Sequence, residues 1–148
     1  MQVLEIFRRK EVALYTTTPQ QSLAAAIDAM AQFDVGSLVV MEHGKMVGML
    51  TFREVLVALK QRGGEASGVT VGDVMVKNPV TVFPSMEAND LRRLMIEKHS
   101  RYVPVMDGDT LMGVISFLDV AKAVLDEQGF ENQMLKSYIK NWPEEPQI

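Results

Sequence analysis

Cysteine is absent from the 148-residue sequence, which excludes disulfide bonds, thiolate metal sites and a cysteine nucleophile. Long apolar runs are absent too, since no stretch approaches the roughly 18 apolar residues that a membrane-spanning helix needs. Residues 1–11, MQVLEIFRRKE, carry charges inside the apolar core that a signal peptide would require. We therefore expect a cytoplasmic protein with neither a membrane anchor nor a secretory signal.

An excess of basic charge is also missing. The 15 Lys and Arg residues are outnumbered by 19 Asp and Glu residues, which gives a formal net charge of −4 at pH 7. A chain with this balance repels the phosphate backbone of nucleic acids rather than neutralising it. Nucleic acid is therefore not expected as a partner, although a local basic site for one small phosphate is compatible with the composition.

Catalytic signatures are missing as well. The sequence has no G-x-S-x-G elbow, no P-loop and no G-x-G-x-x-G motif. The two histidines, His43 and His99, lie far apart and lack the spacing of paired metal ligands. We expect no metal site, no catalytic cofactor and no enzymatic activity.

An internal repeat is the main feature that the sequence does have. A shift of 65 residues places about residues 12–60 on the second half of the chain without a gap. Turn, strand and helix positions match together, which two unrelated helices would not produce. The matched pairs include Thr16 and Thr81, Pro19 and Pro84, Met30 and Met95, Gly48 and Gly113, Thr51 and Ser116, and Phe52 and Phe117.

Hydrophobic periodicity predicts the same elements, β-α-β-β-α, in each half. In the first half they cover 13–17, 20–33, 37–41, 45–51 and 52–61, and in the second half 79–83, 87–99, 102–106, 111–116 and 117–128. A unit of this size does not easily bury both faces of its sheet alone. The predicted fold class is therefore α+β, with two pseudo-symmetric repeats packed through their sheets.

The predicted organisation has four parts. Residues 1–62 form the first repeat with an N-terminal segment, 63–70 a linker rich in glycine and small polar residues, and 71–128 the second repeat. Residues 129–148 form a C-terminal amphipathic helix and tail that covers one end of the module or a dimer partner. Its apolar residues at four-residue spacing are Phe130, Met134, Tyr138 and Trp142.

The phrases GMLTFRE (48–54) and GVISFLD (113–119) place a hydroxyl and a carboxylate three residues apart where a strand gives way to a helix. One interpretation is a capping box, in which the two side chains satisfy backbone N–H groups of the first turn. The other is half of a ligand site, because a helix N-terminus attracts anions and a carboxylate accepts hydrogen bonds from a diol. The residues alone leave both interpretations open.

The doubled pattern, with GVISFLD, the proline-bearing TTTPQQSL and TVFPSMEA, and RYVPVMD before a turn, resembles a tandem pair of cystathionine β-synthase (CBS) domains, also called a Bateman module. This resemblance implies a regulatory module that binds an adenosine-containing ligand in clefts between the repeats. The ligand would be AMP, ADP, ATP, NAD(H) or S-adenosylmethionine. It also implies a homodimer and an output through a separately encoded enzyme or transporter.

The resemblance assigns residues to two clefts, each built from both repeats. The first and better supported cleft would use Thr16, Thr18, Ser37, Leu38, Ile115, Ser116 and Asp119, with Asp119 on the ribose diol. The second would use Leu50, Thr51, Glu54, Thr81, Arg101, Tyr102 and Val103, with Arg101 on a phosphate. Glu54 departs from the family pattern, which has Asp there, so the second cleft is expected to be weaker, empty or differently specific.

A structural or scaffolding protein without a ligand is the alternative. In that case the repeat is kept for packing, and the two hydroxyl and carboxylate pairs act only as helix caps.

Overall fold

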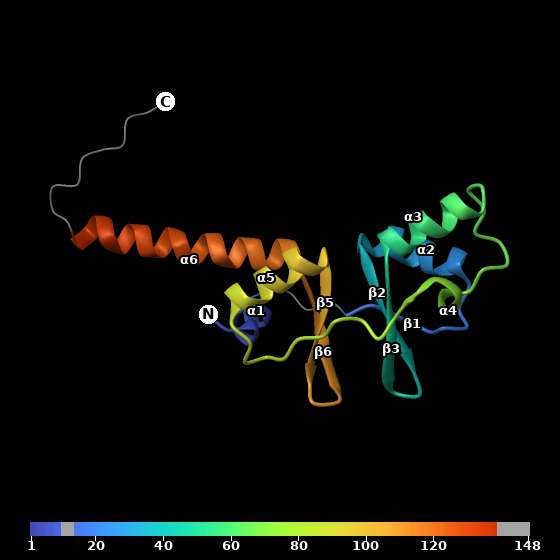
Figure 1. The fold of residues 1–148 in the computed structure, drawn as a ribbon, viewed down its shortest axis with the longest axis horizontal. Coiled ribbons are helices and arrows are strands. Elements are labelled where there is room, and N and C mark those ends of the chain that lie inside the picture. The colour runs from blue at the N-terminus through green and yellow to red at the C-terminus, as the bar shows by residue number, and fades with distance from the viewer. Residues whose placement is uncertain (10–13, 139–148) are drawn as a thin grey trace, which may run out of the picture.

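The computed structural model describes residues 1–9 and 14–138, with side chains described as far as Gly129. Two β-hairpins stand side by side at the centre and helices flank them, which confirms the α+β class (Figure 1). The elements are α1 (Val3–Arg9), β1 (Thr16–Thr17), α2 (Leu23–Phe33), β2 (Ser37–Glu42), β3 (Lys45–Thr51), α3 (Phe52–Gln61), α4 (Val71–Val74), β4 (Val76–Lys77), α5 (Ala88–Lys98), β5 (Tyr102–Asp107), β6 (Thr110–Ser116) and α6 (Phe117–Tyr138).

The two repeats share their strand pairing in detail. In the first sheet the order is β1-β2-β3-β4, with β1 parallel to β2 and the other pairs antiparallel. The second sheet is the β5–β6 hairpin. Both hairpins shift register at the same place, between Val40 and Met41 and between Val105 and Met106. The repeat seen in the sequence is therefore a repeat of backbone geometry.

The predicted strand at 79–83 is reduced to one bridge. Only Val82 pairs, in parallel with Val105, and its N–H donates to the Pro104 carbonyl at 3.0 Å. Pro79 opens this run and Pro84 follows it, and proline has no N–H to extend a ladder. β1, the equivalent segment of the first repeat, forms two pairs.

Each repeat has its own core, but short segments are exchanged between them. Helix α1 was expected with the first repeat, yet Val3, Ile6 and Phe7 are buried in the core of the second. Conversely, Val69, at the end of the predicted linker, and Val71 of α4 are buried in the core of the first. Burial of an aliphatic or aromatic side chain contributes about 1.5–3 kcal/mol. The exchange therefore ties the repeats together beyond the contact of their sheets.

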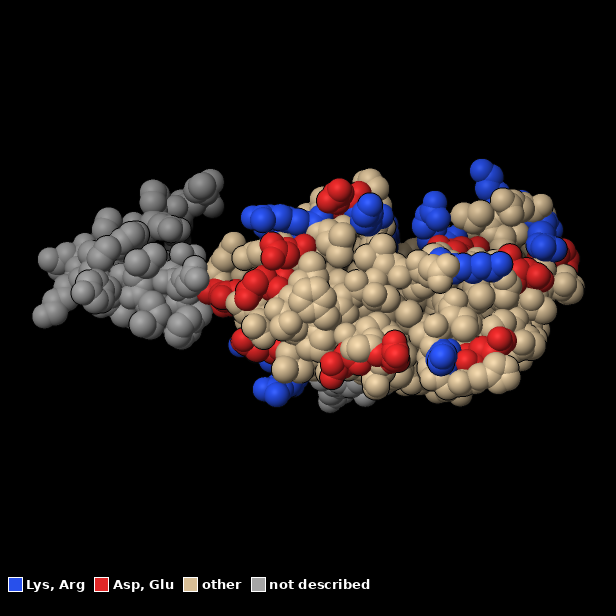
Figure 2. Space-filling model, turned by 60° about the horizontal axis from the view of Figure 1, so that its bottom comes forward, with Lys and Arg blue, Asp and Glu red and all other residues tan. Residues whose placement is uncertain are grey.

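Helix α6 runs without a break from Phe117 to Tyr138, so the amphipathic C-terminal helix predicted from residue 129 is not a separate element. The side chains of Phe130, Met134 and Tyr138, and all of Trp142, lie outside the described part. Among the helices that the structure describes, none combines the length and apolar character needed to cross a bilayer. Acidic and basic groups alternate around a broad area free of both on the face in Figure 2.

Candidate functional site

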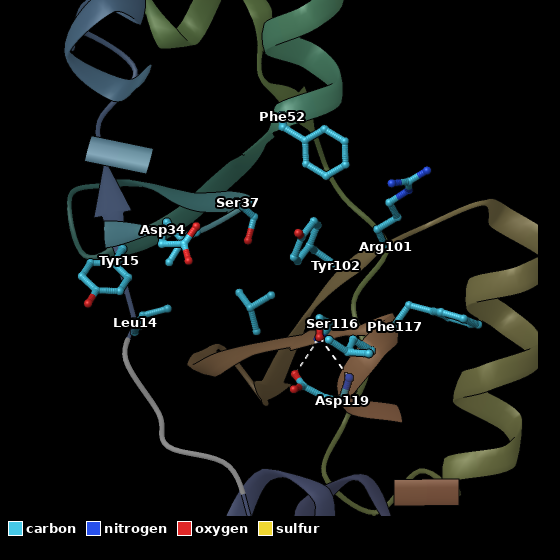
Figure 3. Close-up of a pocket in the computed structure, with 14 residues that line it drawn as sticks. Leu14, Tyr15, Asp34, Ser37, Phe52, Arg101, Tyr102, Ser116, Phe117 and Asp119 are labelled. Carbon is cyan, nitrogen blue, oxygen red and sulfur yellow. Dashed lines mark hydrogen bonds between the residues drawn. The ribbon is translucent and has the colours of Figure 1, made fainter. Parts of the chain in front are cut away.

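The first cleft, of about 630 Å³, lies between the two repeats (Figure 3). This volume falls within the range of small-molecule sites, about 300–1,000 Å³. Its walls come from the segment before β1, the α2–β2 turn, the start of β5 and the β6–α6 junction. The lining residues are Leu14, Tyr15, Asp34, Val35, Gly36, Ser37, Phe52, Arg101, Tyr102, Val114, Ser116, Phe117, Leu118 and Asp119.

Ser116 and Asp119 form a reciprocal capping box at the start of α6. The Ser116 N–H donates to Asp119 Oδ2 at 2.9 Å, and the Asp119 N–H donates to Ser116 Oγ at 3.1 Å. In these bonds the hydroxyl only accepts, so it keeps its hydrogen to donate. A carboxylate has about four lone-pair sites, so the bond from Ser116 does not exhaust its capacity. The pair is a helix cap and also part of a cleft wall.

The second cleft, of about 850 Å³, is the pseudo-symmetric counterpart of the first. A shift of 65 residues relates Ser116 and Asp119 of the first cleft to Thr51 and Glu54 of the second. The lining residues are Met49, Thr51, Phe52, Arg53, Glu54, Leu56, Val57, Val76, Asn78, Pro79, Val80, Lys98, His99, Ser100, Arg101 and Tyr102.

The capping box of the second cleft is closed more tightly than that of the first. Glu54 Oε1 accepts from the Thr51 N–H at 3.0 Å and also from the Thr51 hydroxyl at 2.8 Å. Thr51 Oγ1 in turn accepts from the Arg53 N–H at 3.3 Å. The additional methylene of Glu54 lets its carboxylate reach the hydroxyl, so Thr51 uses its hydrogen inside the protein.

Phe52, Arg101 and Tyr102 line both clefts and form the wall between them. The Tyr102 ring meets Phe52 edge-on, with centroids 6.2 Å apart, and the Arg101 guanidinium carbon lies 5.2 Å from the centre of the Phe52 ring. Gly36 permits this arrangement, because a Cβ there would collide with the Tyr102 hydroxyl and lie 2.7 Å from its Cζ. We call Phe52, Arg101 and Tyr102 the shared wall.

The structure brings together only part of the predicted set. Ser37, Ser116 and Asp119 line the first cleft, Thr51 and Glu54 the second, and Arg101 and Tyr102 both. Four predicted side chains instead lie in the cores, at most 1% exposed, which differs from the expectation: Leu38, Leu50, Val103 and Ile115. Strand side chains alternate between faces, so the adjacent residues line the clefts: Ser37, Met49, Thr51, Tyr102, Val114 and Ser116.

The predicted threonines Thr16, Thr18 and Thr81 are exposed and line neither cleft. Tyr15, which sequence reasoning missed, lines the first cleft and stacks on Phe33 with ring centroids 4.4 Å apart. The parallel pairing of β1 with β2 brings Tyr15 to this edge, because its carbonyl accepts from the Val39 N–H at 3.1 Å.

Asp34 and His99 were also missed, and they occupy equivalent places. Each is the C-cap of its helix, α2 or α5, with a left-handed backbone at φ 53°. Asp34 lines the first cleft and His99 the second. Both positions follow a helix and precede a cleft-lining strand, but their place at a cleft depends on how the two repeats pack.

A third capping box shows that the pattern also occurs without a cleft. The Thr70 N–H donates to Asp73 Oδ2 at 3.0 Å at the start of α4. This hydrogen bond lowers the pKa of the Asp73 carboxyl below its ordinary value. Neither residue lines either cleft. Within the described ranges, no group of three or more His, Asp or Glu side chains is arranged to hold a metal ion.

Comparison with known proteins gives consistent matches. The family model of the CBS domain matches twice, at residues 5–61 and 71–126. The mitochondrial CBS domain-containing protein CBSX3 of Arabidopsis thaliana is 30% identical over 128 residues, which is 83% of this chain and 62% of that protein. The chain therefore spans less than two thirds of the length of that relative.

Two solved structures show the same arrangement. A protein with CBS domains from Burkholderia ambifaria MC40-6 matches with a TM-score of 0.81 at 28% identity, over 86% of this chain and 96% of that one. CBSX2 of Arabidopsis thaliana in complex with AMP matches with a TM-score of 0.67 at 27% identity, over 78% of this chain and 90% of that one. With two family matches that coincide with the two structural repeats, the chain belongs to the CBS-domain family and carries a tandem pair of CBS domains.

Proposed function

We propose that this chain is a regulatory module that senses an adenosine-containing ligand in the first cleft. The observation that carries the proposal is the composition of this cleft from both repeats, with a hydroxyl, a carboxylate, a helix N-terminus, a cation and aromatic rings on its walls. The similarity to CBSX2, whose structure was solved in complex with AMP, supports the same class of ligand.

Each part of the ligand has a partner of suitable chemistry in the proposed complex. Asp119 accepts hydrogen bonds from the ribose diol, which a carboxylate does with both oxygens. The Ser116 hydroxyl, the N-terminus of α6 and Arg101 face the phosphate, where the helix dipole and the cation favour negative charge. Val114 and Tyr15 provide apolar surface for the base. No step of this account is catalytic, and the module acts by binding alone.

Regulation follows from the position of the cleft. A ligand that contacts both repeats favours the relative arrangement in which all its contacts form, by an amount limited to its differential affinity for the two states. We further propose that two chains associate as a homodimer and act on a separately encoded enzyme or transporter. Exposed apolar side chains on the outer helices support such contacts, among them Leu56 of α3 and Leu118 and Leu125 of α6.

Thermal unfolding with a panel of AMP, ADP, ATP, NAD(H), S-adenosylmethionine and GTP tests the proposal. A ligand at 100 times its Kd stabilises the folded state by ~2.7 kcal/mol, which corresponds to a shift of about 5–10 °C at 2–4 °C per kcal/mol. In Asp119→Ala the ligand loses a hydrogen bond to a charged group, worth ~1.5–3 kcal/mol. We therefore expect its affinity to fall about ten- to a hundredfold.

Asp73→Ala is the matched control, because it removes the same type of cap outside the clefts. Both variants should lose a small amount of stability, because each leaves one backbone N–H of its N-cap residue without its carboxylate partner. Only Asp119→Ala should show a smaller stabilisation by ligand than the wild type does at the same ligand concentration. An unchanged ligand affinity in Asp119→Ala would overturn the assignment of the ribose contact.

The scaffolding alternative is favoured by one observation: the Thr70 and Asp73 pair makes a cap without a cleft. If no ligand of the panel shifts the unfolding temperature, the pairs in both clefts are caps only, and the chain acts by packing against partners.

A further inference from the structure

The two clefts carry opposite charge. The first is lined by one cation, Arg101, and two carboxylates, Asp34 and Asp119. The second is lined by three cations, Arg53, Lys98 and the same Arg101, against one carboxylate. Because the clefts are otherwise pseudo-symmetric, this difference comes from single positions rather than from a difference in fold.

Equivalent positions show how the difference arises. The 65-residue shift relates Leu118 of the first cleft to Arg53 of the second, and Asp34 of the first to His99 of the second. The same shift relates Phe33 to Lys98. Leu118 of the first cleft thus corresponds to a cation of the second and Asp34 to an imidazole, whereas Phe33, the equivalent of Lys98, does not line the first cleft. Neither Lys98 nor Arg101 forms an ion pair among the described side chains, and Arg53 lies 3.9 Å from Glu54 with 78% of its side chain exposed.

The capping box of the second cleft points in the same direction. Thr51 donates its hydroxyl hydrogen to Glu54, and Glu54 Oε1 accepts two hydrogen bonds from that one residue. In this pair the hydroxyl hydrogen and one carboxylate oxygen are therefore used within the cap. Recognition in the second cleft rests on its cations, and a cluster of cations selects for phosphate charge rather than for ribose hydroxyls.

We propose that the second cleft is selective for adenosine ligands that carry a polyphosphate chain, whereas the first accepts ligands with little phosphate charge. This inference rests on the proposed function, and it assigns different ligand classes to two clefts that the repeat makes alike. Arg53 and Lys98 contact the terminal phosphates, and Arg101 contributes from the shared wall.

Isothermal titration of the full chain with AMP and with ATP, in a buffer of about 0.15 M monovalent salt without divalent cations, tests this division. The variant Arg53→Gln/Lys98→Gln removes one cation of α3 and one of α5 from the second cleft. Its matched control, Lys60→Gln/Arg93→Gln, removes one cation from each of the same two helices, and neither residue lines a cleft. Both variants change the net charge equally.

Each cation near a phosphate changes affinity about fivefold, judged from the Coulomb energy of a unit charge pair at about 4 Å in water. ATP should therefore bind Arg53→Gln/Lys98→Gln about 25-fold more weakly than it binds the wild type, and AMP should change by less than about fivefold. The control should keep the ATP affinity of the wild type within about threefold, since charges beyond a Debye length are largely screened.

The outcomes separate this inference from the proposed function. If AMP and ATP bind the wild type but both double variants behave alike, the adenosine-sensing function stands and the polyphosphate selectivity of the second cleft is refuted. An equal loss of AMP and ATP affinity in Arg53→Gln/Lys98→Gln would also refute it. If neither nucleotide binds the wild type, both the proposed function and this inference fail.

Discussion

Gly36→Ala should disrupt the shared wall between the clefts. Glycine is not needed there for its backbone, because Gly36 does not adopt a left-handed conformation. It is needed for space, since a Cβ would collide with the Tyr102 hydroxyl, lie 2.7 Å from Cζ of the same ring and 3.3 Å from Cδ1 of Phe52. The Tyr102 ring must therefore move, and this movement disturbs its edge-on contact with Phe52.

The expected cost follows from this overlap. Adding a methyl group to a packed site costs typically ~1–3 kcal/mol, and the loss of glycine's freedom in the unfolded chain offsets ~0.4–1 kcal/mol of it. We expect a net destabilisation of about 1–2 kcal/mol, which lowers the Tm by roughly 2–8 °C. Urea unfolding monitored by circular dichroism gives the same quantity at constant temperature.

A double-mutant cycle with Tyr102→Ser tests the cause. Serine is the residue at the equivalent position of the first repeat, Ser37, and the substitution removes the ring that the new methyl meets. We expect Gly36→Ala to cost nothing measurable in the Tyr102→Ser background, a coupling of about 1 kcal/mol or more. Equal costs of Gly36→Ala in both backgrounds would refute the steric argument.

Two further predictions concern α1 and the cap outside the clefts. Gly113→Ala should destabilise the protein by more than Gly36→Ala does, because Gly113 has φ +155° and a Cβ there would collide with the Phe7 ring. The urea unfolding midpoints of the two variants test this order, and a smaller loss of stability in Gly113→Ala would contradict the prediction. Asp73 has a pKa below its ordinary value because its carboxylate accepts a hydrogen bond from the Thr70 N–H. Its contribution to folding stability is therefore fully present above the pKa of the unfolded state, and it is lost as pH falls through the lower pKa of the folded state. The Tm difference between wild type and Asp73→Asn should therefore narrow as pH falls from about 7 to below about 4; a difference that is constant over this range would contradict the assignment.

The residue-by-residue alignment of the two repeats was predictable because many equivalent positions carry the same or a similar residue. Pairs such as Gly48 with Gly113 and Phe52 with Phe117 fix the two hairpins and the helices that follow them. Helix α3 begins and ends at the predicted residues, because Thr51 marks the junction and Glu54 strengthens the cap.

The face of each strand was not predictable in the same way. Leu38, Val39 and Val40 are all buried, so β2 is a continuous apolar run in which no alternation shows which side chain faces a cleft. The resemblance named Leu38 along with Ser37, and Ile115 along with Ser116, whereas only Ser37, Ser116 and the unnamed Val114 line the first cleft. A shift by one residue along a strand moves a side chain to the opposite face.

Long-range packing was the other part that the sequence did not disclose. Nothing in residues 3–9 indicates that their apolar face packs on the second repeat, because an amphipathic pattern predicts a buried helix face but not the surface against which that face packs. Asp34 and His99 escaped for a related reason. Their role depends on where the end of a helix lies relative to the other repeat.

The exchange of segments has a consequence for the order in which the chain folds during synthesis. Helix α1 is made well before the groups that hold it: the Val3 N–H donates to the Met86 carbonyl, and Phe7 packs on Gly113. Such distant contacts close slowly and leave apolar surface exposed in the meantime. The first repeat likewise lacks β4 until Val76 and Lys77 have been added. Helix α1 thus leaves the ribosome before the second repeat does, and it docks only when the second repeat is present.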